Sequence, residues 1–330
     1  MGKYHVSVDS GGSKIKAVLY DGDFRLISRA VTGSVRRNST PAGLCDRNLA
    51  DLMAQLFGGH DEIRDIAEIH GSVDGEIIDA IAARGSVGSV AGEGEGKIGL
   101  AAAGIDGEGL LCLSGTGATM FYLDPAGHRS DGMGGYGAVV FDEGSGYHIG
   151  RLACAEAIRY DEGRGKPTLL RGLIAEHFGM PDDFRLAVFK GVYGDPGRSP
   201  VAAVAGLAPV VSRAAYLGDE TAMAILRQAG HALGDQMNAL IRRCGCGDTV
   251  PMTVSGGTYR GHIALFDSLC ETIRAENPRR PIVRPLFEPV AGGVIADWFA
   301  QGRPFDDAAR TFLLQEYRDY IFTIGVNPSC

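Results

Sequence analysis

Short apolar segments alternate with polar and glycine-rich segments along the first third of the chain. Residues 4–9 and 15–20 are apolar runs on either side of a glycine pair, which predicts two strands joined by a tight turn. A third strand is predicted at 26–31, and leucines near helical spacing predict a helix over 41–57. Further strands at 66–69, 87–91 and 110–113 alternate with helices at 75–84 and 97–103. This alternation predicts an α/β domain that closes near Leu113.

The second half begins with another strand at 120–124 and a hairpin through 132–141, and helices are predicted from 145 to 243. Within 222–241 apolar residues recur every three or four positions, which defines one buried helix face made of Leu226, Ala229, Leu233, Met237 and Leu240. The later chain predicts strands at 251–254 and 282–287, helices at 263–273, 294–300 and 306–323, and a small-residue turn at 291–293.

A chain of 330 residues exceeds the size at which a single hydrophobic core usually stops growing, so two domains are expected. We place the first domain at 1–113 and the second at 114–305, with the C-terminal segment 306–330 returning to the first. A cleft between the two domains is then the expected place for a ligand.

The composition is 45% hydrophobic and 22% charged, which is typical of a globular chain. No apolar stretch approaches the ~20 residues of a membrane span, so no membrane partner is expected. A net charge of -8 without a basic run argues against a nucleic-acid partner. The strand-like start without a signal-peptide pattern and the seven scattered cysteines favour a cytoplasmic location with reduced thiols. The Cys244–Cys246 pair lacks the further ligands of a structural zinc site.

Four small-residue clusters stand where predicted strands end: VDSGGSK at 8–14, LSGTGAT at 113–119, FDEGSG at 141–146 and VSGGT at 254–258. Glycines in a tight turn leave main-chain N–H groups free to bind phosphate oxygens. Two such turns predict a polyphosphate held from two sides, with Asp9 and Asp142 as carboxylates for a cation and a hydroxyl. The pattern favours ATP-dependent phosphoryl transfer, although the GxxxxGK[ST] spacing of a P-loop is absent.

These clusters resemble the acetate and sugar kinase/Hsp70/actin ATPase superfamily, and within it the N-acetylglucosamine kinase and BadF/BadG-type branch. VDSGGSK and LSGTGAT resemble its two phosphate motifs, residues 134–150 resemble its Asp-Glu-Gly-Ser signature, and VSGGT resembles its adenosine motif. The resemblance covers nearly the whole chain. It implies an α/β fold of two ribonuclease-H-like, actin-like ATPase domains around a nucleotide cleft. It also implies ATP with Mg²⁺ and phosphorylation of the 6-hydroxyl of N-acetylglucosamine or a related hexosamine.

Carried over residue by residue, the resemblance implies three sets of site residues. The phosphates and the metal would be bound by Asp9, Gly11, Gly12, Ser13, Lys14, Gly115, Thr116 and Gly117. The adenosine would lie against Ser255, Gly256, Gly257, Gly292 and Gly293. The sugar would contact Asn38, Thr116, Asp142 and Gly146. His70 stands where the family pattern has a small residue, and from a cleft position it would bind a sugar hydroxyl. Asn38 also fits a turn residue, and His70 also fits a buried structural histidine.

The catalytic base is where this sequence departs from the family pattern. The family has an aspartate after the strand that precedes the second phosphate motif, whereas residues 90–97 here read VAGEGEGK. Glu93 best fits the register set by Ile98, and Glu95 is second, because residues two apart on a helix point to nearly opposite sides. We therefore predict that Glu93 is the base and acts with Asp9. The two glutamates also fit a solvated acidic loop.

Three functions stay open at this stage: an amino-sugar kinase, an ATPase of the same branch with another substrate, and a sugar-binding regulator without turnover. Dehydratase activators in this branch hold an iron–sulfur cluster through cysteines, and no suitable cysteine pair is found here. The sequence does not fix the oligomeric state, and a homodimer is one option.

Overall fold

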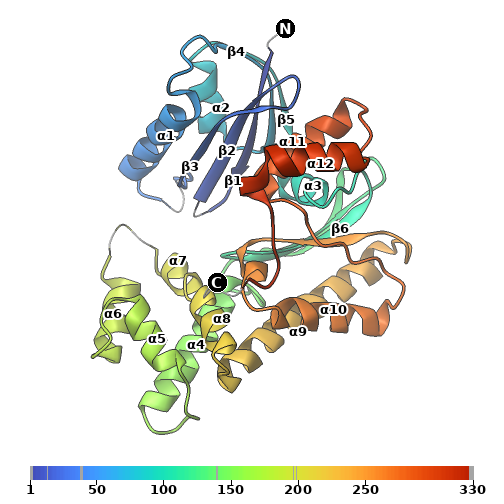
Figure 1. Cartoon of the computed structure of the whole chain (residues 1–330). Coiled ribbons are helices and arrows are strands. Elements are labelled where there is room, and N and C mark those ends of the chain that lie inside the picture. The colour runs from blue at the N-terminus through green and yellow to red at the C-terminus, as the bar shows by residue number, and fades with distance from the viewer. Residues whose placement is uncertain are drawn as a thin grey trace. The chain divides into compact units, whose positions relative to one another are not determined.

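The computed structural model divides the chain into two compact units (Figure 1). Unit 1 comprises Met1–Gly109, Leu123–His128 and Pro285–Phe322, and unit 2 comprises Leu110–Tyr122, Arg129–Arg284 and Thr323–Cys330. The residues described are 3–12, 14–37, 40–138, 140–195, 197 and 199–326. The division differs from the expected one in the last third of the chain, because residues 285–305 lie with the first unit and not with the second.

Unit 1 is built on a five-stranded sheet in the order β3 (Leu26–Gly33), β2 (Lys14–Asp21), β1 (Tyr4–Ser10), β4 (Asp65–Ser72) and β5 (Ser86–Gly92). The first three strands are antiparallel, whereas β1, β4 and β5 run parallel. Parallel neighbours need crossover helices, which are α1 (Ala42–Phe57) and α2 (Gly75–Ala82). The carboxyl ends of β1, β4 and β5 therefore meet at one edge of the sheet, where Asp9 pairs with Ser72.

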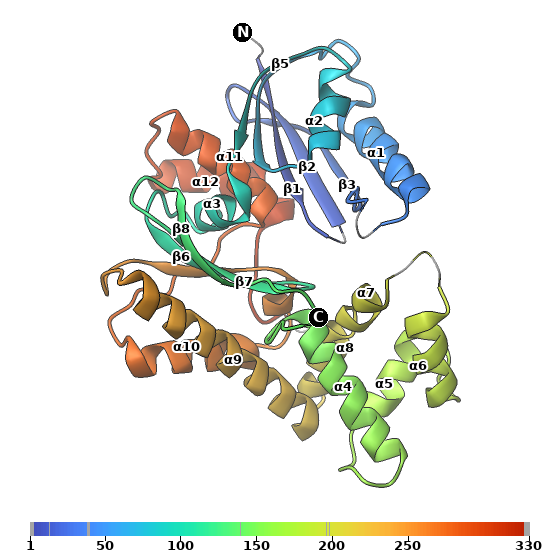
Figure 2. The same cartoon turned by 180° about the vertical axis from the view of Figure 1, so that it is seen from behind.

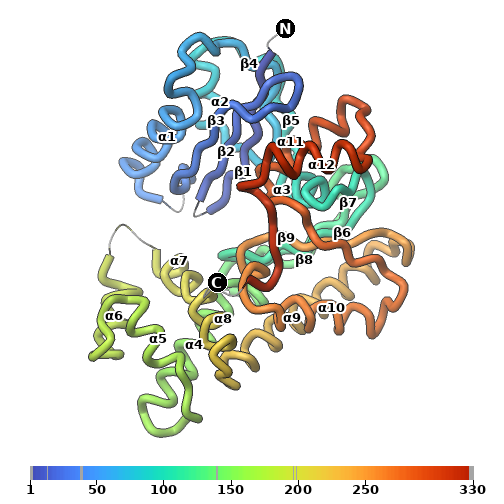
Figure 3. The backbone as a smooth tube through the Cα atoms, viewed as in Figure 1, coloured from blue at the N-terminus to red at the C-terminus, as the bar shows by residue number. Residues whose placement is uncertain are grey.

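Both faces of this sheet are covered, since alternate side chains of β2 point to opposite sides. Ala17 and Leu19 belong to a core with α1 and α2. Val18 and Tyr20 belong to a second core with the end of α3 (Gly94–Ala101), α11 (Pro289–Ala300) and α12 (Asp307–Glu316). Figure 3 shows α11 and α12, from the C-terminal third, beside α3 from the N-terminal third. Unit 1 is thus a three-layer α/β structure.

Unit 2 is built on a four-stranded sheet in the order β8 (Arg129–Gly134), β7 (Ala118–Leu123), β6 (Gly109–Ser114) and β9 (Met252–Ser255). Strands β6 and β9 are parallel, so their carboxyl ends lie at the same edge. The helices that follow are α4 (Gly146–Asp161), α5 (Leu170–His177), α6 (Phe184–Tyr193), α7 (Pro200–Ala205), α8 (Ala208–Tyr216), α9 (Glu220–Cys244) and α10 (Ala264–Glu276). Figure 2 shows α9 and α10 side by side. The predicted apolar face of α9 is buried, which confirms that prediction.

Two predictions about the later chain are wrong. No strand forms over 282–287, where the structure has only isolated bridges at Ile282 and Phe287. The expected turn at 291–293 lies inside α11, which begins at Pro289 because a proline at the first helical position costs no hydrogen bond. Among the described residues, no helix combines the length and the apolar composition that crossing a membrane requires.

The two glycines of α11 are there for close packing. A Cβ atom at Gly292 would collide with Ile98 O of α3, and one at Gly293 would collide with Ser7 Oγ of β1. Ser7 Oγ also donates a hydrogen bond of 2.6 Å to Val290 O, which holds α11 against the sheet.

We predict that Gly292→Ala destabilises unit 1 by about 1–3 kcal/mol, because the added methyl group forces two helices apart. The matched control is Gly43→Ala, since Gly43 is a helical glycine with no atom within 4 Å of its Cβ position. Gly43→Ala should leave the free energy of unfolding equal or slightly higher. Urea unfolding of both variants measures the difference, and equal stability of Gly292→Ala and the unmodified chain would contradict this packing.

Candidate functional site

The turn between β1 and β2 presents open backbone next to a carboxylate. Gly11 N donates to Lys14 O at 2.9 Å, which closes the turn. No atom lies within 4 Å of the Cβ position of Gly12, so the backbone is accessible on that side. Asp9 ends β1 just before the turn, and Lys14 begins β2 with an exposed side chain. Ser13 lies outside the described residues.

Asp9 stands at a concentration of negative charge. Burial, followed by the charge of Glu95, raises the pKa of Asp9 to about 6, and Glu288 adds to the rise. Lys16 and Arg36 act in the opposite direction. Lys16 also forms an ion pair with Glu288, the residue that precedes α11. The carboxylates therefore outweigh the cations near Asp9, and a further cation there would relieve the imbalance.

The loop after β3 is tied to the end of β1. Arg36 Nη2 donates to Ser10 O at 2.7 Å, and Arg36 Nε lies 3.3 Å from Asp74 Oδ1. Ser10 Oγ donates to Asp74 Oδ2. Asp74, at the start of α2, thus positions the turn through Ser10. Asn38, two residues beyond Arg36, lies outside the described residues.

Glu93 faces the interior of unit 1. Its side chain is 4% exposed, Oε2 accepts a hydrogen bond of 2.8 Å from Gly71 N, and Oε1 lies 3.2 Å from His70 Nδ1. His70 is itself only 1% exposed, which leaves no room for a sugar hydroxyl, so we do not carry that hypothesis forward. Burial lowers the pKa of His70, but the hydrogen bond to Glu93 and the charges of Asp297 and Glu93 raise it above its usual range.

Glu95 has a different environment from Glu93. It lies in the first turn of α3, where Glu93 is the capping residue, and it is partly exposed. The charge of Glu95 contributes to the raised pKa of Asp9, so the two carboxylates lie close enough to interact electrostatically. The two glutamates therefore point to different surroundings, and the structure favours Glu95 over Glu93 as the residue that accompanies Asp9.

In unit 2 the turn between β6 and β7 is held by the loop before α4. Asp142 Oδ1 accepts from Ala118 N at 3.1 Å, Gly146 N donates to Gly115 O at 2.8 Å, and Ser114 Oγ donates to Gly144 O at 2.8 Å. Burial raises the pKa of Asp142, although the Ala118 N–H lowers it. These bonds leave the turn itself partly exposed, and no atom lies within 4 Å of the Cβ position of Gly115.

The third glycine-rich segment of unit 2 joins the same place. Ser255 ends β9 and pairs with Leu113 of β6. Gly256 has φ +108, and a Cβ atom on it would collide with Ser114 O. Thr258 Oγ1 donates to Ser114 O at 2.8 Å. Gly257 is exposed and open. Three of the predicted clusters thus converge at the carboxyl ends of β6 and β9.

Some predicted site residues have structural roles. Gly146 is buried with its N–H committed to Gly115 O, and a Cβ atom on it would lie 2.9 Å from that oxygen. Gly292 and Gly293 are buried in α11 of unit 1, whereas the Ser255–Gly257 segment belongs to unit 2. Sequence reasoning missed Arg36 and Glu288. Only Arg36 could have been found from the local sequence, because it lies two residues before Asn38, a predicted sugar ligand.

The fold of two mixed α/β units is shared with the solved structures reported below, which confirms the predicted fold class. The model of the BadF/BadG/BcrA/BcrD ATPase family matches residues 6–296. The chain therefore belongs to the BadF/BadG/BcrA/BcrD ATPase family, as the resemblance indicated.

Two kinases are similar to the chain over more than half of its length. An N-acetylmuramic acid/N-acetylglucosamine kinase of Clostridium acetobutylicum is 28% identical over 305 residues, 89% of this chain and 97% of the relative. An N-acetyl-D-glucosamine kinase of Dictyostelium discoideum is 28% identical over 57% of this chain and 58% of the relative.

Solved structures share the fold. A candidate N-acetylglucosamine kinase from Porphyromonas gingivalis has a TM-score of 0.68 at 18% identity, covering 90% of this chain and 99% of that one. A ROK family glucokinase from Streptomyces griseus, solved with glucose and AMPPNP, has a TM-score of 0.57 at 17% identity, covering 91% of this chain and 99% of that one.

We predict that Asp9→Asn stabilises the chain in the absence of ligands. A carboxyl group whose pKa is about 6 in the folded state, above its ordinary value of 3.8, costs stability once it ionises. The cost is absent below pH ~4 and complete above pH ~6, where it amounts to about 1–3 kcal/mol. Thermal unfolding without Mg²⁺ should therefore give a higher Tm for Asp9→Asn at pH 8 and equal Tm values near pH 4. A lower Tm at pH 8 would contradict the charge imbalance.

Proposed function

We propose that this chain is an ATP-dependent kinase that phosphorylates the 6-hydroxyl of N-acetylglucosamine or a related amino sugar. The structural observation that carries the proposal is the position of Asp9, whose pKa is raised by burial and by the charge of Glu95, beside the open turn at Gly11–Gly12. The Clostridium acetobutylicum relative supports the substrate class, because its match extends over 97% of its own length.

In this proposal both open turns bind phosphate oxygens of ATP. The main-chain N–H of Gly12, with Ser13 and Lys14, would bind them in unit 1. Those of Thr116 and Gly117 would bind them in unit 2, where Gly115 N already donates to Gly117 O at 2.8 Å and so shapes the turn. Ser255 and Gly257 would lie against the adenosine. Gly256 would act by keeping that segment close to Ser114.

The residues present fit a magnesium ion at Asp9. The charge imbalance among Asp9, Glu95 and Glu288 favours a divalent cation, and carboxylate oxygens suit Mg²⁺. When bound, Mg²⁺ neutralises charge on the β- and γ-phosphates. Asp9 would hold the ion in its ionised state. Lys16 of β2 forms an ion pair with Glu288 and so keeps that carboxylate beside β2.

Glu95 would act as the general base. Its carboxylate takes the proton from the sugar 6-hydroxyl as the oxygen forms its bond to the γ-phosphorus, and the bond from that phosphorus to the β-phosphate oxygen breaks to release ADP. Glu93 is unsuited to this step, because Gly71 N and His70 already engage its two buried oxygens. Glu93 would instead fix the start of α3 and so position Glu95.

Asn38 would bind the sugar, as the family resemblance implies. Asp142 has one oxygen engaged by Ala118 N and is 9% exposed, so we assign it chiefly to holding the β6–β7 turn in shape. The length of the glutamate at position 95, one methylene more than an aspartate, would set how far the sugar lies from α3.

We predict that Glu95→Gln lowers kcat by about 10²–10⁴-fold with little change in the KM for ATP, because only proton removal is lost. Glu93→Gln is the matched control. It should change kcat by less than about tenfold while lowering Tm, because it weakens a buried hydrogen-bonded carboxylate. The reverse order of the two kcat effects would return the base role to Glu93.

We also predict that ADP release in a coupled assay depends on the sugar. N-acetylglucosamine or N-acetylmuramic acid should raise the rate at least about tenfold above hydrolysis without sugar, since closure over a sugar excludes water from the phosphoryl group. Equal rates with and without sugar would favour the other ATPase function of this branch. Sugar binding without any turnover would favour a regulator.

A further inference from the structure

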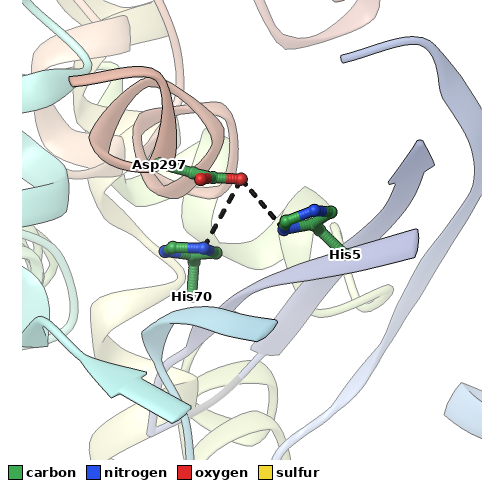
Figure 4. A group of neighbouring side chains, drawn as sticks. All are labelled: His5, His70 and Asp297. Carbon is green, nitrogen blue, oxygen red and sulfur yellow. Dashed lines mark ion pairs between the residues drawn. The ribbon is translucent and has the colours of Figure 1, made fainter. Parts of the chain in front are cut away.

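Three side chains from distant parts of the sequence meet inside unit 1, as Figure 4 shows. His5 comes from β1, His70 from β4 and Asp297 from α11. One ligand atom of each, a ring nitrogen or a carboxylate oxygen, lies within 4.8 Å of the others. We propose that these residues form a binding site for a divalent transition-metal ion, with Zn²⁺ as the best match. This site is separate from the magnesium site at Asp9 and does not depend on the proposed function.

The two distances that join the histidines to Asp297 suit a tetrahedral ion, and the two histidine nitrogens lie within 4.8 Å of each other. His5 Nδ1 lies 3.1 Å and His70 Nε2 lies 3.5 Å from the same oxygen, Asp297 Oδ2. Zinc bonds of about 2.0–2.1 Å give ligand-to-ligand distances of about 3.3–3.4 Å in a tetrahedron. Both nitrogens are buried and make no hydrogen bond of good geometry, despite the nearby carboxylate. A metal ion would satisfy both.

The surrounding hydrogen bonds aim the ligands at one point. An ionised carboxylate only accepts, so His70 Nδ1 donates to Glu93 Oε1, and Nε2 is the nitrogen turned toward Asp297. A histidine whose other nitrogen donates to a carboxylate is typical of metal ligands. Asp297 is held in turn, because Tyr20 Oη donates to its Oδ2 at 2.8 Å and Gln301 Nε2 to its Oδ1 at 3.0 Å.

The ligand types select the ion. Two imidazole nitrogens and one carboxylate oxygen suit Zn²⁺, whereas Mg²⁺ prefers oxygen ligands only. Glu68 Oε2 lies 3.4 Å from His70 Nε2, and its side chain is 32% exposed, so Glu68 can supply a fourth ligand and a way in from solvent. A bound ion would join β1, β4 and α11, the elements that carry or adjoin Asp9, Gly71 and Glu288.

The test uses the full chain, stripped with EDTA and then dialysed against Zn²⁺ in excess Mg²⁺, which occupies oxygen-only sites. We expect one zinc ion per chain by elemental analysis and a higher Tm than without zinc. His5→Gln should lose the bound zinc, and Glu93→Gln should bind it about 10- to 100-fold more weakly. His231→Gln, at an exposed histidine, and the double variant Cys244→Ser/Cys246→Ser should both retain it.

A second measurement needs no variant. Co²⁺ in place of Zn²⁺ should give the visible bands of a tetrahedral nitrogen and oxygen site without a thiolate charge-transfer band. The proposal is overturned if the unmodified chain retains no zinc. In that case His5 and His70 interact with Asp297 only as ion pairs without a metal. It is equally overturned if His5→Gln folds and retains zinc, or if the cobalt spectrum shows thiolate ligands.

Discussion

The candidate site is governed by one carboxylate, Asp9, which is buried at the end of β1 close to other charged groups. Strand β1 pairs on both sides, with β2 and β4, so the position of Asp9 at its end is fixed. Crossover helices bring the start of α3 to the same edge, and with it Glu95. Burial and the charges of Glu95 and Glu288 raise the pKa of Asp9 by more than Lys16 and Arg36 lower it. The site therefore attracts cations, and the adjacent glycine turn has N–H groups that can bind anions. Metal and phosphate are complementary ligands for such a place.

Glycines in unit 2 have two physical roles that the motifs do not separate. Gly117, Gly146 and Gly256 have close neighbours at their Cβ positions, Asp142 Oδ2, Gly115 O and Ser114 O respectively, so these three allow segments to approach. Gly115 and Gly257 have open space there, so these two leave room for a ligand beside the backbone. The first group holds the turns together, and the second leaves them accessible to a ligand.

Local patterns predicted most of the fold. The strands around Gly11–Gly12, the helix face of α9 and the convergence of glycine turns at strand ends follow from periodicity and turn chemistry within short windows. Gly292 and Gly293 were misjudged as a turn, because their partners Ile98 and Ser7 are far away in the sequence. The choice between Glu93 and Glu95 depends on His70 and Gly71 in another strand, which no local register shows. Long-range pairs such as Lys16 with Glu288 lie beyond sequence reasoning for the same reason.

The most direct test of this account is the pKa of Asp9 itself, measured by carbon-13 NMR of its carboxyl group in the chain without ligands. The account predicts a value of about 6 in the unmodified chain. We expect a lower Asp9 pKa in Glu95→Gln, because that change removes the negative charge that raises this pKa most. An Asp9 pKa near the 3.8 of an ordinary aspartate, unchanged in Glu95→Gln, would show that neither burial nor the charge of Glu95 acts on this carboxylate.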